Sequence, residues 1–124
     1  MTHPFAIQLF IAGRLTNPLN GSLSRAHWSR KSEWANGWKH RTKIAWLMAG
    51  KPTWDGPAIV TFHGRVARLF DDEGFIASCK PCRDAAVTLI LGTGDGPTCG
   101  HEFHYRQEVR PAAERGVLVE VMPK

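Results

Sequence analysis

The chain has 124 residues, of which 43% are hydrophobic, and a formal net charge of +5. This length suits one domain with an ordinary core, and the composition excludes a disordered chain and a fibre. No apolar run is long enough to span a bilayer and the N-terminal residues lack the basic region of a signal peptide, so we expect a cytoplasmic protein without membrane contact. Three cysteines are an odd number, which argues against a disulfide framework.

The first half of the chain predicts a strand and then a long basic helix. Residues 4–12 are apolar and β-branched, so we expect a strand buried on both faces. Turn residues follow, and a helix is predicted from near Arg25 to Ala49, with Ser24 as its N-cap. Asn36-Gly37 favours a break in this helix. Four residues at helical spacing are expected to face the core: Trp34, Trp38, Ala45 and Trp46.

The second half predicts a strand, a helix and two further strands. Residues 58–63 favour a strand, Gly64 favours a bulge or strand end, and residues 65–70 continue extended. Residues 75–91 favour a helix, and Pro81 places the start of its regular part near Lys80. Residues 102–108 and 117–122 favour strands. The chain is therefore predicted to be a single small α+β domain over residues 1–124, with a mixed four-stranded sheet and two main helices.

An acidic triplet, Asp71-Asp72-Glu73, lies between the second strand and the second helix. Asp71 and Glu73 are two residues apart, so at an extended strand end they would point to one side and repel unless a cation lay between them. Asp95, in the loop after the helix, is a further acid. The other interpretation is a solvated turn at a helix N-terminus, where acids are favoured. Residue types alone leave both interpretations open.

The positive charge is concentrated before this triplet. Residues 1–66 hold nine Lys/Arg and two Asp/Glu, whereas residues 67–124 hold seven and nine. A basic surface beside carboxylates is typical of phosphate binding, although modest positive charge is also common in soluble proteins. Trp28 is predicted either to stack on a base or to belong to the core. The candidate DNA-binding residues are Arg25, His27, Trp28, Arg30, Lys31, Lys39 and Arg41.

A cysteine pair predicts a different kind of metal site. Cys79 and Cys82 have Cys-x₂-Cys spacing, and Cys99 and His101 follow at a distance near that of zinc ribbons. If these four residues held zinc, the chain would be a zinc-stabilised nucleic-acid-binding module. Buried free cysteines and strand histidines are the alternative.

Taken in order, these motifs resemble the RusA family of Holliday-junction resolvases, in its phage and prophage branch. The resemblance covers nearly the whole chain and is carried by Asn20, His27-Trp28, residues 71–75, residues 80–84, residues 94–97 and Tyr105-Arg106-Gln107. It implies a homodimeric endonuclease that uses Mg²⁺, with Mn²⁺ as a substitute, to cut four-way or branched DNA in a bacterial host cell. By position, it implies that Asp71, Glu73 and Asp95 bind the metal and that Lys80 places a charge near the scissile phosphate.

Three residues depart from the family's pattern. Glu73 stands where Asp is usual, Gly74 where Asn is usual, and Gly94 where a loop Asp is usual. Mg²⁺ requires near-ideal octahedral geometry and supporting groups around its ligands, so these changes bear on activity. The sequence therefore also allows a degenerate member that binds branched DNA without cutting it.

Overall fold

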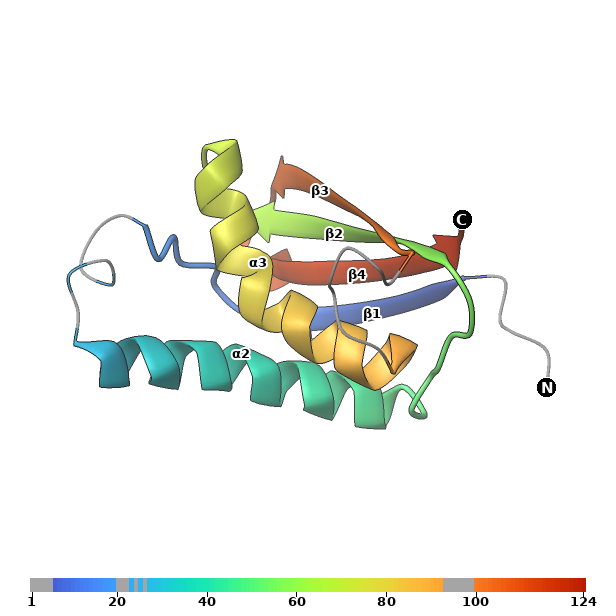
Figure 1. Cartoon of the computed structure of the whole chain (residues 1–124). Coiled ribbons are helices and arrows are strands. Elements are labelled where there is room, and N and C mark those ends of the chain that lie inside the picture. The colour runs from blue at the N-terminus through green and yellow to red at the C-terminus, as the bar shows by residue number, and fades with distance from the viewer. Residues whose placement is uncertain (1–5, 20–22, 24, 26, 93–99) are drawn as a thin grey trace.

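A computed structural model of the chain describes residues 6–19, 23, 25, 27–92 and 100–124 (Figure 1). Its four strands form one sheet in the order β1-β4-β2-β3. The predicted α+β class, with a mixed four-stranded sheet and two main helices, is confirmed. The elements in chain order are β1 (Ile7–Ala12), α2 (Trp28–Met48), β2 (Ala58–Val66), α3 (Asp72–Ala86), the π-helical turn η1 (Val87–Leu91), β3 (Glu102–Val109), the 3₁₀ turn η2 (Ala112–Glu114) and β4 (Gly116–Pro123).

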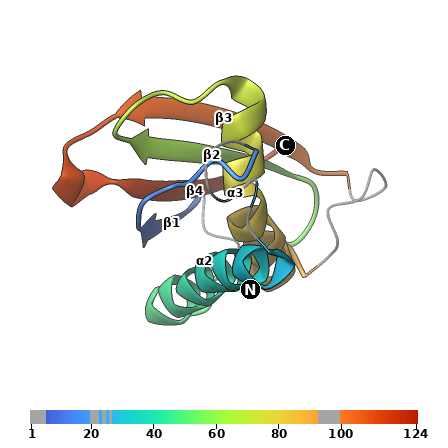
Figure 2. The same cartoon turned by 90° about the vertical axis from the view of Figure 1, so that its left-hand side faces the viewer.

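The pairing of the strands requires a crossover connection between β2 and β3. β4 runs antiparallel to both β1 and β2, and its residue Val121 lies opposite Ile7 on one side and Val60 on the other. β2 and β3 are parallel, so the chain needs a long crossover between them, and α3 provides it. Both helices cover the same face of the sheet (Figures 1 and 2).

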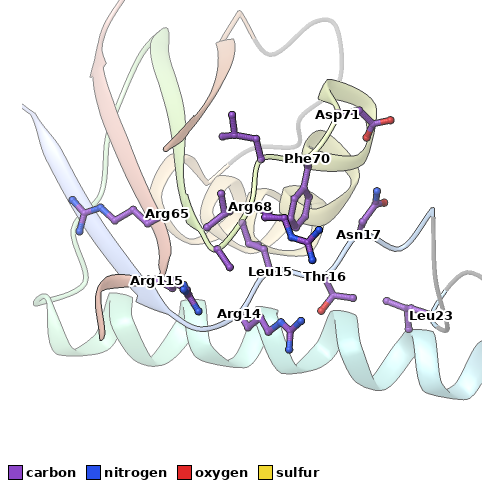
Figure 3. A pocket seen from close by; sticks show the side chains of 13 residues that line it. Arg14, Leu15, Thr16, Asn17, Leu23, Arg65, Arg68, Phe70, Asp71 and Arg115 are labelled. Atoms are coloured by element: carbon purple, nitrogen blue, oxygen red, sulfur yellow. The ribbon is translucent and has the colours of Figure 1, made fainter. Parts of the chain in front are cut away.

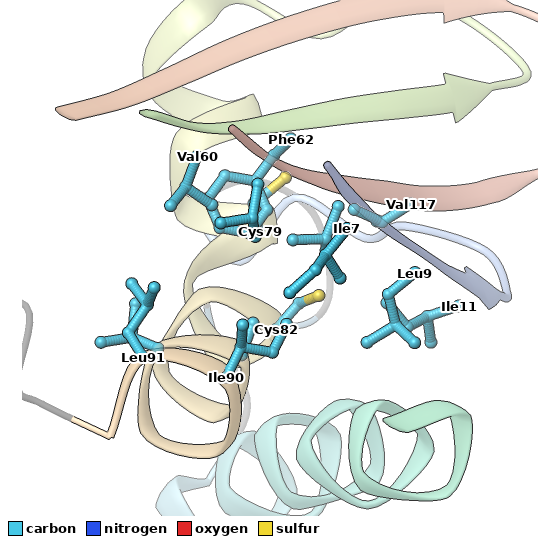
Figure 4. Packing of buried hydrophobic residues seen from close by; sticks show 14 of the residues in the cluster. Ile7, Leu9, Ile11, Val60, Phe62, Cys79, Cys82, Ile90, Leu91 and Val117 are labelled. Carbon is cyan, nitrogen blue, oxygen red and sulfur yellow. The ribbon is translucent and has the colours of Figure 1, made fainter. Parts of the chain in front are cut away.

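The core fills the space between the sheet and the helices (Figure 4). Along β1, buried and exposed residues alternate, and Ile7, Leu9 and Ile11 point into the core. The prediction of a strand buried on both faces is therefore wrong. β1 is an edge strand of a sheet that carries helices on one face, so every second side chain faces away from the core.

α2 is one continuous helix, and Asn36-Gly37 does not break it. The cost of a mid-helix glycine is only about 1 kcal/mol, and packing of the buried Trp38 offsets it. Trp34, Ala45 and Trp46 pack against the core as predicted. Within the described ranges, no helix combines the length and the apolar character needed to cross a membrane.

The start of α2 also differs from the prediction. The helix begins at Trp28 rather than near Arg25, and His27 is its N-cap, with ring Nδ1 accepting a hydrogen bond from the Ser29 N–H at 3.3 Å. Ser24, the predicted cap, lies outside the described residues. A histidine ring nitrogen thus accepts the hydrogen bond that the hydroxyl was expected to accept.

α3 begins at Asp72 and continues through Pro81, so its regular part does not start near Lys80 as predicted. Proline in a helix interior costs about 3 kcal/mol, because it removes a hydrogen bond and crowds the preceding turn. Burial of side chains such as Phe75 and Cys79 on the same helix offsets that cost. Figure 1 shows the axis of α3 changing direction partway along, as expected of a proline-containing helix.

Gly64 neither ends β2 nor forms a bulge, because β2 keeps its register with both neighbouring strands through this residue. A Cβ at position 64 would overlap the ring of Phe75. The glycine is therefore required for close approach of α3 to the sheet. This packing fixes the first turn of α3, which borders the candidate site.

Candidate nucleic-acid interface

A cleft of about 740 Å³ opens beside the start of α3 (Figure 3). Its walls include the loop after β1, the end of β2 with residues 67–71 that lead to α3, and Arg115 before β4. Asp71 is the single acid among the described residues that line it. Four arginines also line it: Arg14, Arg65, Arg68 and Arg115.

Sheet topology brings these arginines together from separate parts of the chain. Arg14 follows β1, Arg68 follows β2, and Arg115 precedes β4. Because β4 is antiparallel to both β1 and β2, these three positions lie at the same end of the sheet. The Gly13 N–H donates to the Arg115 carbonyl oxygen at 3.2 Å, which ties the loop after β1 to the start of β4.

The arginine side chains differ in direction. In Figure 3, those of Arg14, Arg68 and Arg115 lie around the cleft, whereas Arg65 points away. The Arg65 guanidinium lies 3.6 Å from a Glu108 carboxylate oxygen and packs over the Phe10 ring, on the face of the sheet opposite the helices. Three cations therefore surround the cleft, and we refer to it as the arginine cleft.

Asp71 borders the arginine cleft as the N-cap of α3. Its Oδ1 accepts a hydrogen bond from the Gly74 N–H at 3.0 Å. Phe70, the residue before Asp71, is held by Gln107 on β3. The Gln107 Oε1 accepts from the Phe70 N–H at 2.8 Å, and its Nε2 donates to the Phe70 carbonyl oxygen at 3.0 Å. The backbone on both sides of Asp71 is thus held, while its side chain remains exposed.

The acidic triplet does not point in one direction. Asp72 and Glu73 lie in the first turn of α3, so the predicted extended geometry that would align Asp71 with Glu73 is wrong. Each helical residue is rotated by about 100° from the last, so residues two apart face different sides. Asp71 lines the arginine cleft, Asp72 lines a separate hollow of about 570 Å³ against β3, and Glu73 is exposed.

The described residues do not by themselves complete the predicted magnesium site. They place Asp71 at the cleft, and no three His, Cys, Asp or Glu residues in the described part of the chain are grouped to hold a metal ion. Asp95, the third predicted ligand, lies outside the described residues. Of the three predicted ligands, the described residues therefore place the Asp71 carboxylate at the cleft and Glu73 away from it.

Lys80 and Asp71 are not neighbours. Lys80 comes nine positions after Asp71, which corresponds to roughly 13 Å along the axis of α3. The Lys80 ammonium instead lies 3.5 Å from the Asp84 carboxylate, one turn further along the same helix. The predicted role for Lys80 at the phosphate beside Asp71 therefore has no support in this geometry.

The predicted DNA-binding cations of α2 form a second, more open surface. Arg30, Lys31 and Lys39 are exposed, as is Arg25 before the helix. Arg41 lies beside the loop after β1, since a Cβ added at Gly13 would lie 2.7 Å from its Nη1, and it lines a separate hollow between β1 and α2. These α2 cations are therefore not among the residues that line the arginine cleft.

Trp28 lies at the exposed start of α2. Its side chain is 71% exposed, so its predicted alternative role in the core is wrong. The Trp28 and His27 rings lie 5.3 Å apart between centroids. This exposed aromatic pair is compatible with stacking on a base, which remains a prediction.

The cysteine pair belongs to the core (Figure 4). Cys79 and Cys82 are both 0% exposed, and burial raises the pKa of each thiol to about 12. Both thiols are enclosed by the hydrophobic cluster, and among the described residues no group of three His, Cys, Asp or Glu that could hold a metal includes them. The Nδ1 atom of His101 accepts a hydrogen bond from the Ala58 N–H at 3.1 Å, and Cys99 lies outside the described residues. This arrangement supports the alternative of buried free cysteines.

The arginines that line the cleft were not predicted from the sequence. Arg14, Arg68 and Arg115 are single cations in three loops, without the local clustering that drew attention to α2. Each of these arginines lies next to the end of a strand. Only the strand order shows that the three strand ends lie at the same end of the sheet. Knowledge of the sheet topology would have been needed to find them.

No protein-family model matches the chain, and comparison with curated proteins gives no match. The resemblance to junction resolvases therefore stays a prediction, and the function has to be argued from the arginine cleft and Asp71.

Proposed function

We propose that this chain binds branched DNA through the arginine cleft and acts as a Mg²⁺-dependent endonuclease that cuts four-way junctions. The observation that carries the proposal is the convergence of Arg14, Arg68 and Arg115 on one cleft that Asp71 borders. Arginine keeps its charge at every relevant pH, and its planar guanidinium can bind two phosphate oxygens at once. Cations from three segments around one hollow favour a phosphate ligand.

Each group at the cleft has a distinct task in this proposal. The three arginines hold the DNA backbone and offset the repulsion between a phosphate and the Asp71 carboxylate. The Asp71 cap and the Gln107 hydrogen bonds keep that carboxylate at the cleft. Asp71 would be a ligand of Mg²⁺, which would supply a nucleophilic water and neutralise charge on the phosphate.

Phosphate contacts give affinity without reading base sequence, so the substrate would be selected by shape. A two-fold homodimer would present two arginine clefts to a four-way junction, which can itself adopt two-fold symmetry. The exposed cations of α2 would extend the contact with the DNA arms. Branched DNA and a second copy of the chain are thus the proposed partners.

A nicking assay on a synthetic four-way junction with Mg²⁺ tests the proposal. Asp71→Asn keeps a side-chain oxygen that can cap α3, so the variant should fold. It should reduce cleavage at least about 100-fold, as expected when a group that stabilises the transition state is lost, while junction binding is retained. Asp72→Asn is the matched control, because Asp72 faces a different hollow, and it should cut like the parent. Cleavage unaffected by Asp71→Asn would remove Asp71 from the site.

A second candidate is junction binding without cleavage. It is favoured by the position of Glu73, which lies in the first turn of α3 and is not aligned with Asp71. This candidate predicts the same arginine-dependent binding but no product at any Mg²⁺ or Mn²⁺ concentration. The nicking assay, run beside a binding assay on the same junction, distinguishes the two candidates.

A further inference from the structure

An asparagine from the loop after β1 lies against the first turn of α3. Gly74 is buried there and donates its N–H to Asp71. A Cβ at position 74 would overlap both the Asn17 Nδ2 and the Asp71 Oδ1, and would lie 2.8 Å from the Asn17 Cγ. The Asn17 carboxamide therefore occupies the space that a side chain at position 74 would take, next to the Asp71 carboxylate.

The orientation of this carboxamide is fixed by its other end. The Asn17 Oδ1 accepts a hydrogen bond from the Leu19 N–H at 2.9 Å, which closes an Asx-turn. With the oxygen engaged by Leu19, the NH₂ group is the end that lies beside Asp71 and Gly74. An amide NH₂ has two donors and no acceptor, so it suits a carboxylate and cannot bind a cation.

We propose that Asn17 is a positioning residue for Asp71. Its NH₂ group lies beside the carboxylate oxygen that also caps α3, and so restricts the movement of the Asp71 side chain at the arginine cleft that both residues line. The absence of a side chain at Gly74 is what admits the amide. This inference rests on the proposed function for what Asp71 does in the cleft, but the relation between Asn17 and Gly74 does not depend on it.

A double-mutant cycle on stability tests that relation without any activity measurement. Gly74→Ala should lower the urea midpoint of the parent, because the new methyl group collides with the Asn17 amide, although alanine favours a helix more than glycine does. In the Asn17→Ala background the collision with the amide is removed while that with the Asp71 Oδ1 remains, so Gly74→Ala should shift the midpoint less than it does in the parent. Equal shifts in both backgrounds would overturn the proposal.

A second variant separates positioning from a role in the turn alone. Asn17→Ser keeps an oxygen that can accept from the Leu19 N–H but removes the NH₂ group. We expect kcat on the four-way junction to fall at least tenfold with KM nearly unchanged, whereas Arg68→Ala should mainly raise KM. Parent-like kcat in Asn17→Ser, or a loss confined to KM, would overturn the positioning role. If the parent itself does not cut, the proposed function fails, and the stability cycle still decides on Asn17.

Discussion

α2 and α3 cover the same face of the sheet but differ in how they are packed. α2 has 21 residues and buries two of them, Trp38 and Thr42, whereas α3 has 15 residues and buries seven. α2 carries exposed cations along much of its length, while α3 begins at the arginine cleft and continues into the core. The comparison shows that a run of charge in the sequence can mark a solvated helix, and that the candidate site forms where the more deeply packed helix begins.

Precise placement of a functional group requires a rigid support, and α3 provides one. Its start is held by the Gln107 hydrogen bonds to Phe70 and by the Phe75 ring against Gly64. By contrast, α2 buries two of its 21 residues. The helix with the stronger charge signal is thus the less constrained of the two.

A pair of glycine substitutions tests this difference most strongly. Gly64→Ala should lower the free energy of unfolding by about 2–3 kcal/mol, because its Cβ overlaps the Phe75 ring of α3. Gly37→Ala on α2 is the matched control, since nothing lies within 4 Å of the added Cβ, and it should raise stability by about 0.5–1 kcal/mol. Both values can be measured by urea unfolding. A Gly64→Ala variant as stable as the parent would contradict the packing of α3 described above.

Arginine substitutions test whether the site lies at the start of α3 or on α2. Arg14→Ala/Arg68→Ala should weaken junction binding by about 10- to 100-fold, and each lost phosphate contact should reduce the slope of log K against log salt by about 0.9. Arg30→Ala/Lys31→Ala should also give weaker and less salt-sensitive binding, but by a smaller factor, since these side chains are exposed on α2. Fluorescence anisotropy at several salt concentrations measures both. The reverse order of effects would make α2 the main DNA-binding surface.

The fold was more accessible from sequence than the site. Local patterns predicted the strands at residues 102–108 and 117–122 and the α+β class, because alternating and β-branched residues report directly on a half-buried sheet. The start of α3 was predicted too late in the chain. The helix-breaking tendency of Pro81 can be recognised from the local sequence, whereas the burial of Phe75, which outweighs it, depends on tertiary packing. The prediction of a bulge or strand end at Gly64 was wrong for the same reason, because the Phe75 ring that requires a glycine there comes from another element.

At the site, sequence reasoning selected Asp71, which does line the arginine cleft. It misjudged the geometry of Glu73, because the helix starts earlier than predicted. The residues from other segments, such as Arg115 and Asn17, had no local signal at all. The resolvase pattern that the sequence resembles has an amide at position 74, and in this structure the Asn17 amide lies in the space beside Gly74. The contact between these two segments is visible only in three dimensions.

The last expected effect concerns the two buried thiols of α3 and is confined to alkaline pH. Cys79 and Cys82 lie on the buried face of α3, and Cys82 is close to Thr42, one of the two buried residues of α2. Burial raises the pKa of both thiols from 9.0 to about 12. Above pH 9 the unfolded chain therefore releases protons that the folded chain retains. Stability should be unaffected by these thiols below pH 9 and should fall as pH rises toward 12, by at most about 1.4 kcal/mol per pH unit for each thiol.

Urea unfolding at pH 8, 9 and 10 checks this prediction in the parent and in Cys79→Ala/Cys82→Ala. The variant is expected to be less stable at every pH, because two buried side chains are shortened, so the informative quantity is the slope of stability against pH rather than its level. Lysine, tyrosine and the remaining cysteine titrate in both proteins and cancel in the comparison. The slope above pH 9 should be shallower in the variant. Equal slopes would mean that the two thiols ionise as readily in the folded chain as in the unfolded one, which would contradict their burial in the core.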